Sequence, residues 1–231
     1  MQFLRTSFFI FLSFIGEFLV IFPELDIAIS KQFYAIDGGF IYSKSPIVSG
    51  IFKSIPLITQ IWCILCTLVL FISVISKKDW KELIKSPAFF LLLAALLGPA
   101  LTVSYGFKEH VGRARPRDIV EFAGTKNFTP VLETSSECIT NCSFSSAHAA
   151  IGFYFTALAW IVSLQYQNIV FLIGVLLGSV VGFGRILQGG HFFSDIVFSF
   201  IVVMIMNELS FKFWFWIKDK IKSQEKNAIK K

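Results

Sequence analysis

Long apolar runs recur along the chain, and they restrict its fold more than any other feature. A helix of about 20 apolar residues crosses the roughly 30 Å hydrocarbon core of a bilayer. The chain of 231 residues is 55% hydrophobic with a mean hydropathy of +0.71, which is more apolar than a soluble domain of this size can bury. We therefore predict an all-α, polytopic membrane protein with a single domain over residues 1–231. Its six transmembrane helices are expected near residues 3–22, 55–75, 87–104, 147–164, 169–183 and 192–209.

Lysine and arginine are unevenly distributed between the loops, and this bias predicts the orientation. If the N-terminus is cytoplasmic, twelve of the 21 cations lie inside. We therefore expect both termini in the cytoplasm and a basic tail, from about residue 211 to 231, along the inner headgroups. The net charge of +6 then reflects topology and not nucleic-acid binding. The twelve are Arg5, Lys77, Lys78, Lys81, Lys85, Lys212, Lys218, Lys220, Lys222, Lys226, Lys230 and Lys231.

Three polar clusters carry almost all of the reactive side chains. They are KEHVGRARPRD at 108–118, FSSAH at 144–148 and GRILQGGHFFSD at 184–195. A loop separates the first two, and two predicted crossings separate the second from the third. All three therefore lie on one membrane face, whichever way the protein is oriented. Cations gathered directly after an apolar helix suit an anion presented at a membrane surface.

The cations and hydroxyl of these clusters form a candidate anion cradle. Lys108, Arg115 and Arg185 can donate to phosphate oxygens, and Ser146 adds a hydroxyl beside the free N–H groups of a helix start. A phosphoryl group depends mainly on such positioning and charge neutralisation for its transfer. We therefore predict that these four residues bind phosphate.

The histidines supply the groups that would react. His191 and Asp195 are four residues apart, so at a helix start they share a face. The carboxylate can take the proton of one imidazole nitrogen and leave the other free as a nucleophile. His148, from a different helix, is then available to protonate a departing alkoxide. Apart from His191 with Asp195, which is better used as a dyad, no histidine has partners at metal spacing, so we expect no metal and no cofactor.

In order along the chain, Lys108 with Arg115-Pro116, Ser146-Ala147-His148, and Arg185 with His191 and Asp195 resemble the three-part signature of the type 2 phosphatidic acid phosphatases, the PAP2 superfamily. The resemblance spans residues 108–195 and implies a helical bundle with its active site on the periplasmic face. It also implies phosphate binding by Lys108, Arg115, Ser146 and Arg185, a phosphohistidine at His191 oriented by Asp195, and leaving-group protonation by His148. The chain has Ser145 and Ala147 where the family usually has Pro and Gly, and Gly184 where it usually has Ser.

The segment CITNCSFSSAH resembles the bacterial lipid A phosphatase branch, which implies the inner membrane and a phosphorylated membrane lipid as substrate. We expect lipid A, with undecaprenyl diphosphate and phosphatidylglycerophosphate as alternatives; a phosphotransferase would need the same residues. An alternative of a different class is a non-catalytic phospholipid carrier, which needs the cations but has no use for His148, His191 and Asp195. The sequence does not indicate the oligomeric state.

The remaining polar residues have simpler interpretations. Cys138 and Cys142 fall in the predicted periplasmic loop, where a disulfide can form, although three intervening residues make a small ring and leave free thiols as the alternative. Arg113 and Arg117 are expected to snorkel or to contact anionic lipid. Glu17 lies inside the first apolar run, where a carboxylate is costly unless it is protonated, reaches water or has a function.

Overall fold

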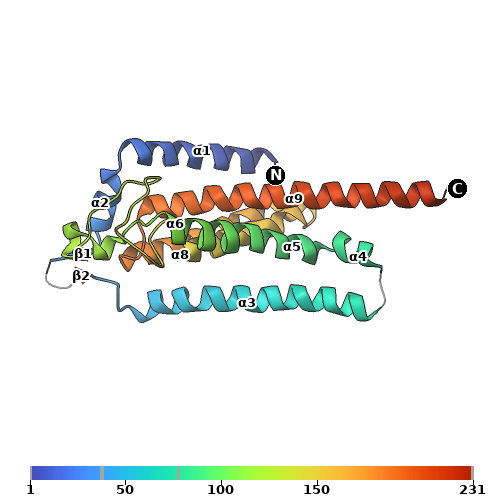
Figure 1. The fold of residues 1–231 in the computed structure, drawn as a ribbon, viewed down its shortest axis with the longest axis horizontal. Helices are drawn as coiled ribbons and strands as arrows, with labels where there is room; N and C mark the ends of the chain where they lie inside the picture. Colours follow the sequence, from blue (N-terminus) through green and yellow to red (C-terminus); the bar gives the residue numbers. More distant parts are fainter. Residues whose placement is uncertain (1, 37–38, 77–78, 230–231) are drawn as a thin grey trace.

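The computed structural model describes residues 2–36, 39–76 and 79–229, which are mostly helical (Figure 1). This confirms the predicted fold class. Lys77, Lys78, Lys230 and Lys231 of the charge bias lie outside the described residues. The longer helices are α1 (Gln2–Ile21), α2 (Glu24–Lys31), α3 (Pro46–Ile75), α5 (Pro87–Ala95), the π-helix η1 (Leu96–Phe107), α7 (Ala147–Tyr154), α8 (Gln167–Leu187) and α9 (Phe193–Ile229).

Short elements connect these helices. β1 (Tyr34–Ala35) and β2 (Gly39–Phe40) form an antiparallel hairpin in which Tyr34 lies opposite Phe40. The other connecting elements are α4 (Trp80–Lys85), α6 (Lys108–His110) and the 3₁₀ helices η2 (Pro116–Asp118), η3 (Val120–Phe122), η4 (Phe155–Trp160) and η5 (Leu164–Tyr166).

Five helical segments in the described part of the chain are long and apolar enough to cross a membrane: Leu4–Ile21, Pro46–Ile75, Pro87–His110, Leu164–Leu187 and Phe193–Asn227. They coincide, within a residue or two or by including the whole run, with five of the six predicted runs. α3 and α5 begin at Ser-Pro pairs, where the Ser45 and Ser86 hydroxyls accept N–H groups of the first turn. Bulky apolar side chains such as Phe14 on α1 and Phe71 on α3 are exposed, as a lipid-facing surface requires. Glu17 is also exposed on α1.

The predicted run at 147–164 differs from the other five. It folds as the eight-residue α7 followed by the six-residue η4, which together are short for a membrane span. Many of its apolar side chains are buried, because α7 packs against α3, η1, α8 and α9 and forms part of the core of the bundle. The count of six spans stays a prediction.

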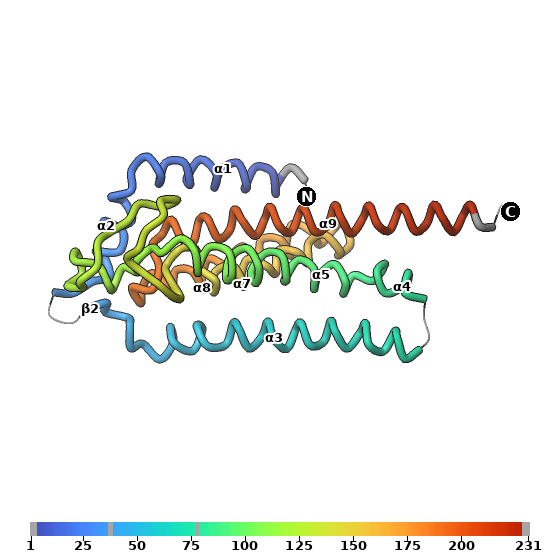
Figure 2. The backbone as a smooth tube through the Cα atoms, in the orientation of Figure 1, coloured from blue at the N-terminus to red at the C-terminus, as the bar shows by residue number. Residues whose placement is uncertain are grey.

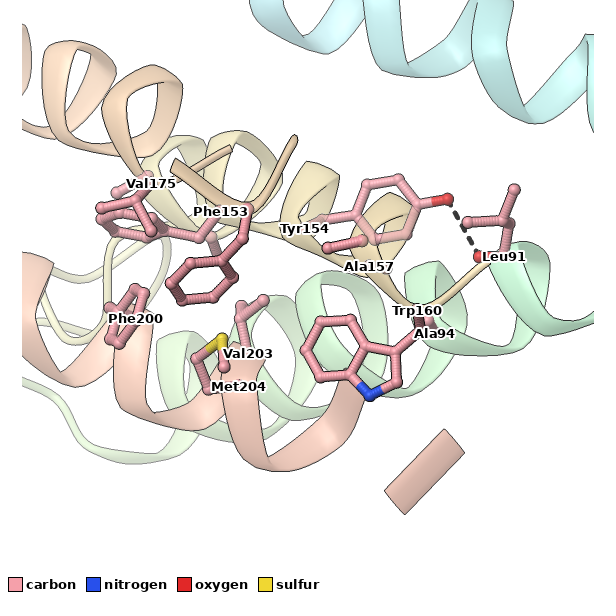
Figure 3. Packing of buried hydrophobic residues seen from close by; sticks show 14 of the residues in the cluster. Leu91, Ala94, Phe153, Tyr154, Ala157, Trp160, Val175, Phe200, Val203 and Met204 are labelled. Atoms are coloured by element: carbon pink, nitrogen blue, oxygen red, sulfur yellow. Dashed lines mark hydrogen bonds between the residues drawn. The ribbon is translucent and has the colours of Figure 1, made fainter. Parts of the chain in front are cut away.

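The core of the bundle lies between α7, α8 and α9. Figure 3 shows Phe153 of α7 beside Phe200 of α9, while Tyr154 points the other way and its hydroxyl donates to the Leu91 carbonyl at 3.0 Å. Glycines allow the helices to approach closely, as is common between membrane helices. A Cβ on Gly152 would lie 2.7 Å from Gly178 Cα, so α7 and α8 touch backbone to backbone.

Most of the loops and short elements that connect the helices gather at one end of the bundle. Figure 2 shows α2, the hairpin strand β2 and the loops around residues 111–146 at this end, where α8 finishes and α9 begins, while α1 starts and α9 finishes toward the other end. α9 runs to Ile229 without a break, and the Lys85 amine of α4 pairs with Glu225 at 2.8 Å. The basic tail therefore prolongs α9, and its position along the inner headgroups stays a prediction.

The close contact between α7 and α8 predicts that Gly178→Ala destabilises the protein. The new methyl group would lie 2.1 Å from the Phe153 ring, so the buried ring must move. Overpacking of this kind costs about 1–3 kcal/mol. The midpoint of thermal unfolding in detergent should fall.

Gly50→Ala in α3 is the matched control, because its methyl group would meet no atom within 4 Å. Its unfolding midpoint should stay the same or rise, since alanine favours a helix over glycine. Equal midpoints for the two variants would contradict the close packing of α7 on α8.

Candidate active site

The structure brings the three predicted clusters together at that end of the bundle. Lys108 follows η1 directly, Ser146 is the N-cap of α7, and Arg185 lies in the last turn of α8. His191 precedes α9, and Asp195 lies in its first turn. The Ser146 N–H approaches the Asp195 carbonyl at 3.5 Å, which joins the second and third clusters.

The Asp195 carboxylate is fully buried and has several donors. Its Oδ1 accepts from Arg113 Nη1 at 2.7 Å. Its Oδ2 accepts from the Ser143 hydroxyl at 2.6 Å and from the Phe192 N–H at 2.9 Å, and lies 3.5 Å from His191 Nδ1. The last distance is at the outer limit of a hydrogen bond, and His191 Nδ1 has no hydrogen-bond partner among the described residues. The nearby negative charge still favours a proton on Nδ1 and a free electron pair on Nε2.

His191 is held as a neutral imidazole. The side chain is 1% exposed, and burial lowers its pKa to about 3, against the opposing effect of Asp195. The positive charges of Arg185 and Lys108 lower this pKa further. The ring is therefore unprotonated at neutral pH, which a nucleophile requires.

Lys108 and Arg115 meet at Asn141. The Lys108 amine donates to Asn141 Oδ1 at 2.7 Å and to the Cys142 carbonyl at 2.9 Å. Arg115 Nη2 donates to the same Oδ1 at 2.8 Å and to the Asn141 carbonyl at 2.6 Å. One residue, absent from the predicted set, thus holds two cations that repel one another.

The Asn141 position depends on a short covalent loop. Cys138 and Cys142 are joined by a disulfide, and Asn141, next to Cys142, has a φ of 53° in the left-handed region. Asparagine tolerates this conformation better than most residues. The disulfide loop therefore presents both oxygens of Asn141 to the cations.

Arg185 and His148 meet across an aromatic ring. The His148 imidazole stacks on Phe52 of α3 with 4.1 Å between ring centroids, and the Arg185 guanidinium carbon lies 4.4 Å from the centre of the same ring. Arg185 also donates to the Gln188 side chain. The two predicted residues therefore share one wall of the site, and Phe52 and Gln188 are additions that the sequence did not indicate.

Both departures from the family signature lie beside predicted site residues. At the first, Ser145 is fully buried and its hydroxyl has no hydrogen-bond partner among the described residues, while the next residue, Ser146, accepts the Ala149 N–H at 3.4 Å as a helix cap. A Cβ on Gly184 would lie 3.4 Å from Val48, an ordinary contact, so a serine would also fit there. Neither departure removes a polar group from the site.

The prediction for Arg113 is wrong. This side chain is fully buried and neither snorkels nor contacts lipid, because it donates to Asp195, to Asp26 Oδ2 at 2.8 Å, to the Ser194 hydroxyl at 2.8 Å and to the Thr129 carbonyl at 2.8 Å. Burial alone would lower its pKa, but the two carboxylates outweigh this and raise it. Asp26 comes from α2, and no spacing in the sequence links it to a residue 169 positions later.

A cavity of about 820 Å³ opens beside the cations. Arg115, Arg185, Asn141 and Gln188 are among the residues that line it. Aromatic residues from the hairpin, α3 and η3 also line it, namely Tyr34, Phe40, Phe52 and Phe122. His191 does not line this cavity; it is buried, close enough to Arg185 for that charge to lower its pKa.

The family model described as the PAP2 superfamily matches residues 87–219, more than half of the chain. The chain belongs to the PAP2 superfamily. The match covers every predicted site residue. A crystal structure of the transmembrane PAP2-type phosphatidylglycerolphosphate phosphatase from Bacillus subtilis superposes with a TM-score of 0.52, covering 90% of this chain and 94% of that one at 19% identity. This similarity supports the PAP2 membrane fold.

Relatives of this PAP2 chain include lipid A 4′-phosphatases. The protein of that name from Francisella tularensis subsp. novicida is 36% identical over 201 residues, 81% of this chain and 85% of the relative. The one from Rhizobium leguminosarum is 33% identical over 115 residues, 48% of each chain. The protein is thus a PAP2-type membrane phosphatase, a phosphoric ester hydrolase.

The disulfide loop predicts redox-dependent binding. Cys138→Ser frees Asn141, so Lys108 and Arg115 lose their shared acceptor and repel one another. Loss of one good hydrogen-bonding partner corresponds to roughly a tenfold effect, so KM for a phosphorylated lipid should rise by about that factor. Reductant added to the wild type should have the same effect.

Cys63→Ser makes the same chemical change at a free cysteine of α3 and should leave KM unchanged. Unaltered kinetics in Cys138→Ser would show that the loop has no part in binding.

The buried neutral His191 predicts a loss of stability in acid. Its pKa is about 3 when folded and 6.5 for the unperturbed group, so the unfolded chain binds the proton more readily. The stabilisation that His191 gives by staying neutral in the folded protein is complete above about pH 6.5 and is lost as the pH falls toward 3. When the pH is lowered from 7 to 5, the free energy of unfolding of the wild type should fall by about 2 kcal/mol more than that of His191→Gln. Thermal unfolding of both proteins at pH 7 and at pH 5 measures this difference. Equal losses in both proteins would contradict a buried neutral histidine.

Proposed function

We propose that the protein removes a phosphate from lipid A through a covalent phosphohistidine at His191. One observation carries this proposal: a neutral, buried His191 faces Asp195 and lies near Arg185, which together with Arg115 lines the cavity. A binding protein would need the cations alone. An imidazole oriented by a buried carboxylate is useful for making a bond.

In the first step His191 Nε2 attacks phosphorus. The N–P bond forms as the bond from phosphorus to the lipid oxygen breaks, and a protonated His148 gives its proton to the departing alkoxide. Burial and the charges of Arg185, Lys108 and Arg115 lower the pKa of His148 to about 4 without substrate, and the negative charge of the bound phosphate offsets these cations and favours the protonated form. The Nδ1 proton of His191 stays directed at Asp195, whose negative charge stabilises the cationic phosphorylated ring.

In the second step water attacks the phosphohistidine. His148, now neutral, takes a proton from the water as its oxygen bonds to phosphorus and the N–P bond breaks. Inorganic phosphate leaves, and both histidines return to their starting protonation states. A second lipid or sugar in place of water would give phosphotransfer.

Phosphate binding requires an exchange of partners at the cations. Asn141 Oδ1 accepts from Lys108 and Arg115, and Gln188 Oε1 accepts from Arg185. Phosphate oxygens offer the same cations stronger, charge-assisted bonds. The amide side chains keep the donors in place until the substrate replaces them, and the Ser146 hydroxyl adds a further donor at the start of α7.

The choice of lipid A is supported by the relatives named as lipid A 4′-phosphatases, one of which aligns over most of this chain. The charge bias and the gathering of the site opposite the start of α1 and the end of α9 support an inner-membrane protein whose site faces the periplasm. Periplasmic exposure also agrees with the Cys138–Cys142 disulfide.

The test is phosphate release by the detergent-purified protein from lipid A, undecaprenyl diphosphate, phosphatidylglycerophosphate and phosphatidic acid, with EDTA present. We expect release from lipid A that EDTA does not suppress. His191→Ala should lower kcat by at least 1,000-fold, as removal of a nucleophile does. Acid-labile, base-stable phosphate on the wild-type protein after rapid quenching would identify the phosphohistidine.

Each other outcome contradicts a defined part of the proposal. Release from a different lipid changes the substrate but keeps the mechanism. Loss of activity with EDTA would mean that a metal takes part. Lipid binding without release by the wild type, unchanged in His191→Ala, would favour a carrier.

A further inference from the structure

Asp26 lies outside the matched PAP2 segment, and its carboxylate is connected to the region of the proposed nucleophile His191 by contacts with Ser194 and Arg113. Asp26 lies on α2, in the connection between α1 and α3, and is fully buried. The family match begins only at residue 87. Asp26 Oδ1 accepts the Ser194 N–H at 2.9 Å, and Oδ2 accepts from Arg113 Nη2 at 2.8 Å and from the Ser194 hydroxyl.

The contact with Ser194 makes Asp26 a cap for α9. The first N–H groups of a helix have no partner within it, and Ser194 is the second residue of α9. A carboxylate from α2 satisfies this N–H and stabilises the positive end of the helix dipole. His191 and Asp195 lie on either side of the capped residue, so the cap fixes the segment that carries both.

The contact with Arg113 extends to the Asp195 carboxylate. Arg113 bonds Asp26 through Nη2 and Asp195 through Nη1, and the Thr129 carbonyl holds its Nε at 2.8 Å. Because a guanidinium is planar, these bonds fix the direction of Asp195 Oδ1. The other oxygen, Oδ2, is then turned toward His191.

We propose that Asp26 and Arg113 are positioning residues that set the orientation of Asp195 and His191, so that the catalytic machinery includes α2 as well as the three signature clusters. This inference rests on the proposed role of His191 as nucleophile. Neither residue is expected to touch substrate, because both side chains are fully buried and neither lines the cavity.

If Asp26 and Arg113 only stabilised the fold, their removal would have different effects from those expected of positioning residues. A structural pair would affect the folded fraction and leave the kinetics of the folded molecules unchanged. A positioning pair affects kcat in molecules that are folded and bind phosphate normally. Asp26 and Arg113 would also act as one unit, so that replacing both lowers kcat no more than replacing the more important one.

The experiment compares Asp26→Asn, Arg113→Lys, Arg113→Met and the double variant Asp26→Asn/Arg113→Met, purified in detergent with the wild type. Asparagine has nearly the shape of aspartate but presents an NH₂ group to a donor in either orientation, whether to Ser194 or to Arg113. Lysine keeps the charge of Arg113 and loses the fork. Glu24→Gln, at an exposed position of the same helix, is the matched control.

We expect kcat on the lipid substrate to fall about 10–100-fold in Asp26→Asn and Arg113→Met, as for other groups that orient a reacting residue. KM and competitive inhibition by inorganic phosphate should stay within about twofold, since Lys108, Arg115 and Arg185 are untouched. The double variant should match the worse single variant, Arg113→Lys should be intermediate, and Glu24→Gln should behave as wild type.

The pH profile supplies a readout that folding alone does not move. The charged groups facing His191 are Asp195 on α9, Arg185 on α8 and Lys108 on α6. Without the Arg113 charge, the Asp195 carboxylate acts more strongly on the imidazole and raises the pKa of His191. The acid limb of kcat against pH should therefore move to higher pH in Arg113→Met.

Wild-type kcat in folded Asp26→Asn and Arg113→Lys would overturn the proposal, as would independent, multiplying losses in the double variant. So would losses of activity that only follow the folded fraction measured by thermal unfolding. Failure of the proposed function looks different, because the wild type would then release no phosphate or His191→Ala would remain active.

Discussion

The carboxylate of Asp195 joins parts of the chain that are far apart in sequence, and the active-site end of the bundle depends on it. Arg113, Ser143 and the Phe192 N–H all donate to it, and His191 faces it. Burying a charge is costly unless it is paired and hydrogen-bonded. Each donor must therefore be in place for the carboxylate to remain buried, which ties the loop around residue 113, the approach to α7 and the start of α9 into one arrangement.

The membrane explains why this chemistry lies at the helix ends. Within lipid every backbone polar group needs an internal partner, so the spans are regular helices and the loops carry the reactive groups. Close glycine contacts then determine how the helices meet. Gly152 and Gly178 bring α7 against α8, and Gly182 lies against Ile196 of α9. Because Ser146, Arg185 and Asp195 lie at the ends of these helices, the packing of the apolar core sets the distances within the polar site.

The cations of the site are held by neutral amide side chains that an anion could replace. Lys108, Arg115 and Arg185 repel one another, and Asn141 and Gln188 offer them neutral oxygens. A neutral acceptor stabilises a buried cation less than a phosphate does. The cations are therefore ordered in the absence of substrate, and the charge gathered in KEHVGRARPRD divides between Lys108 and Arg115, which we propose bind phosphate, and Arg113, which holds Asp195.

The sequence by itself determined the membrane class, the gathering of three clusters on one face and the identity of the residues proposed for phosphate binding and catalysis, because hydrophobic run length, crossing parity and motif spacing are local properties. The roles of Asp26, Arg113 and Asn141 could not be predicted, since they depend on contacts between segments with no fixed spacing. In the sequence, Arg113 has the position of a cation that faces lipid, after the end of an apolar run. Only the tertiary structure shows that it is buried between Asp26 and Asp195. The run at 147–164 likewise has the hydrophobicity of a span, but packing against α8 and α9 places its short helix inside the bundle, because apolar side chains pack as readily against neighbouring helices as against lipid.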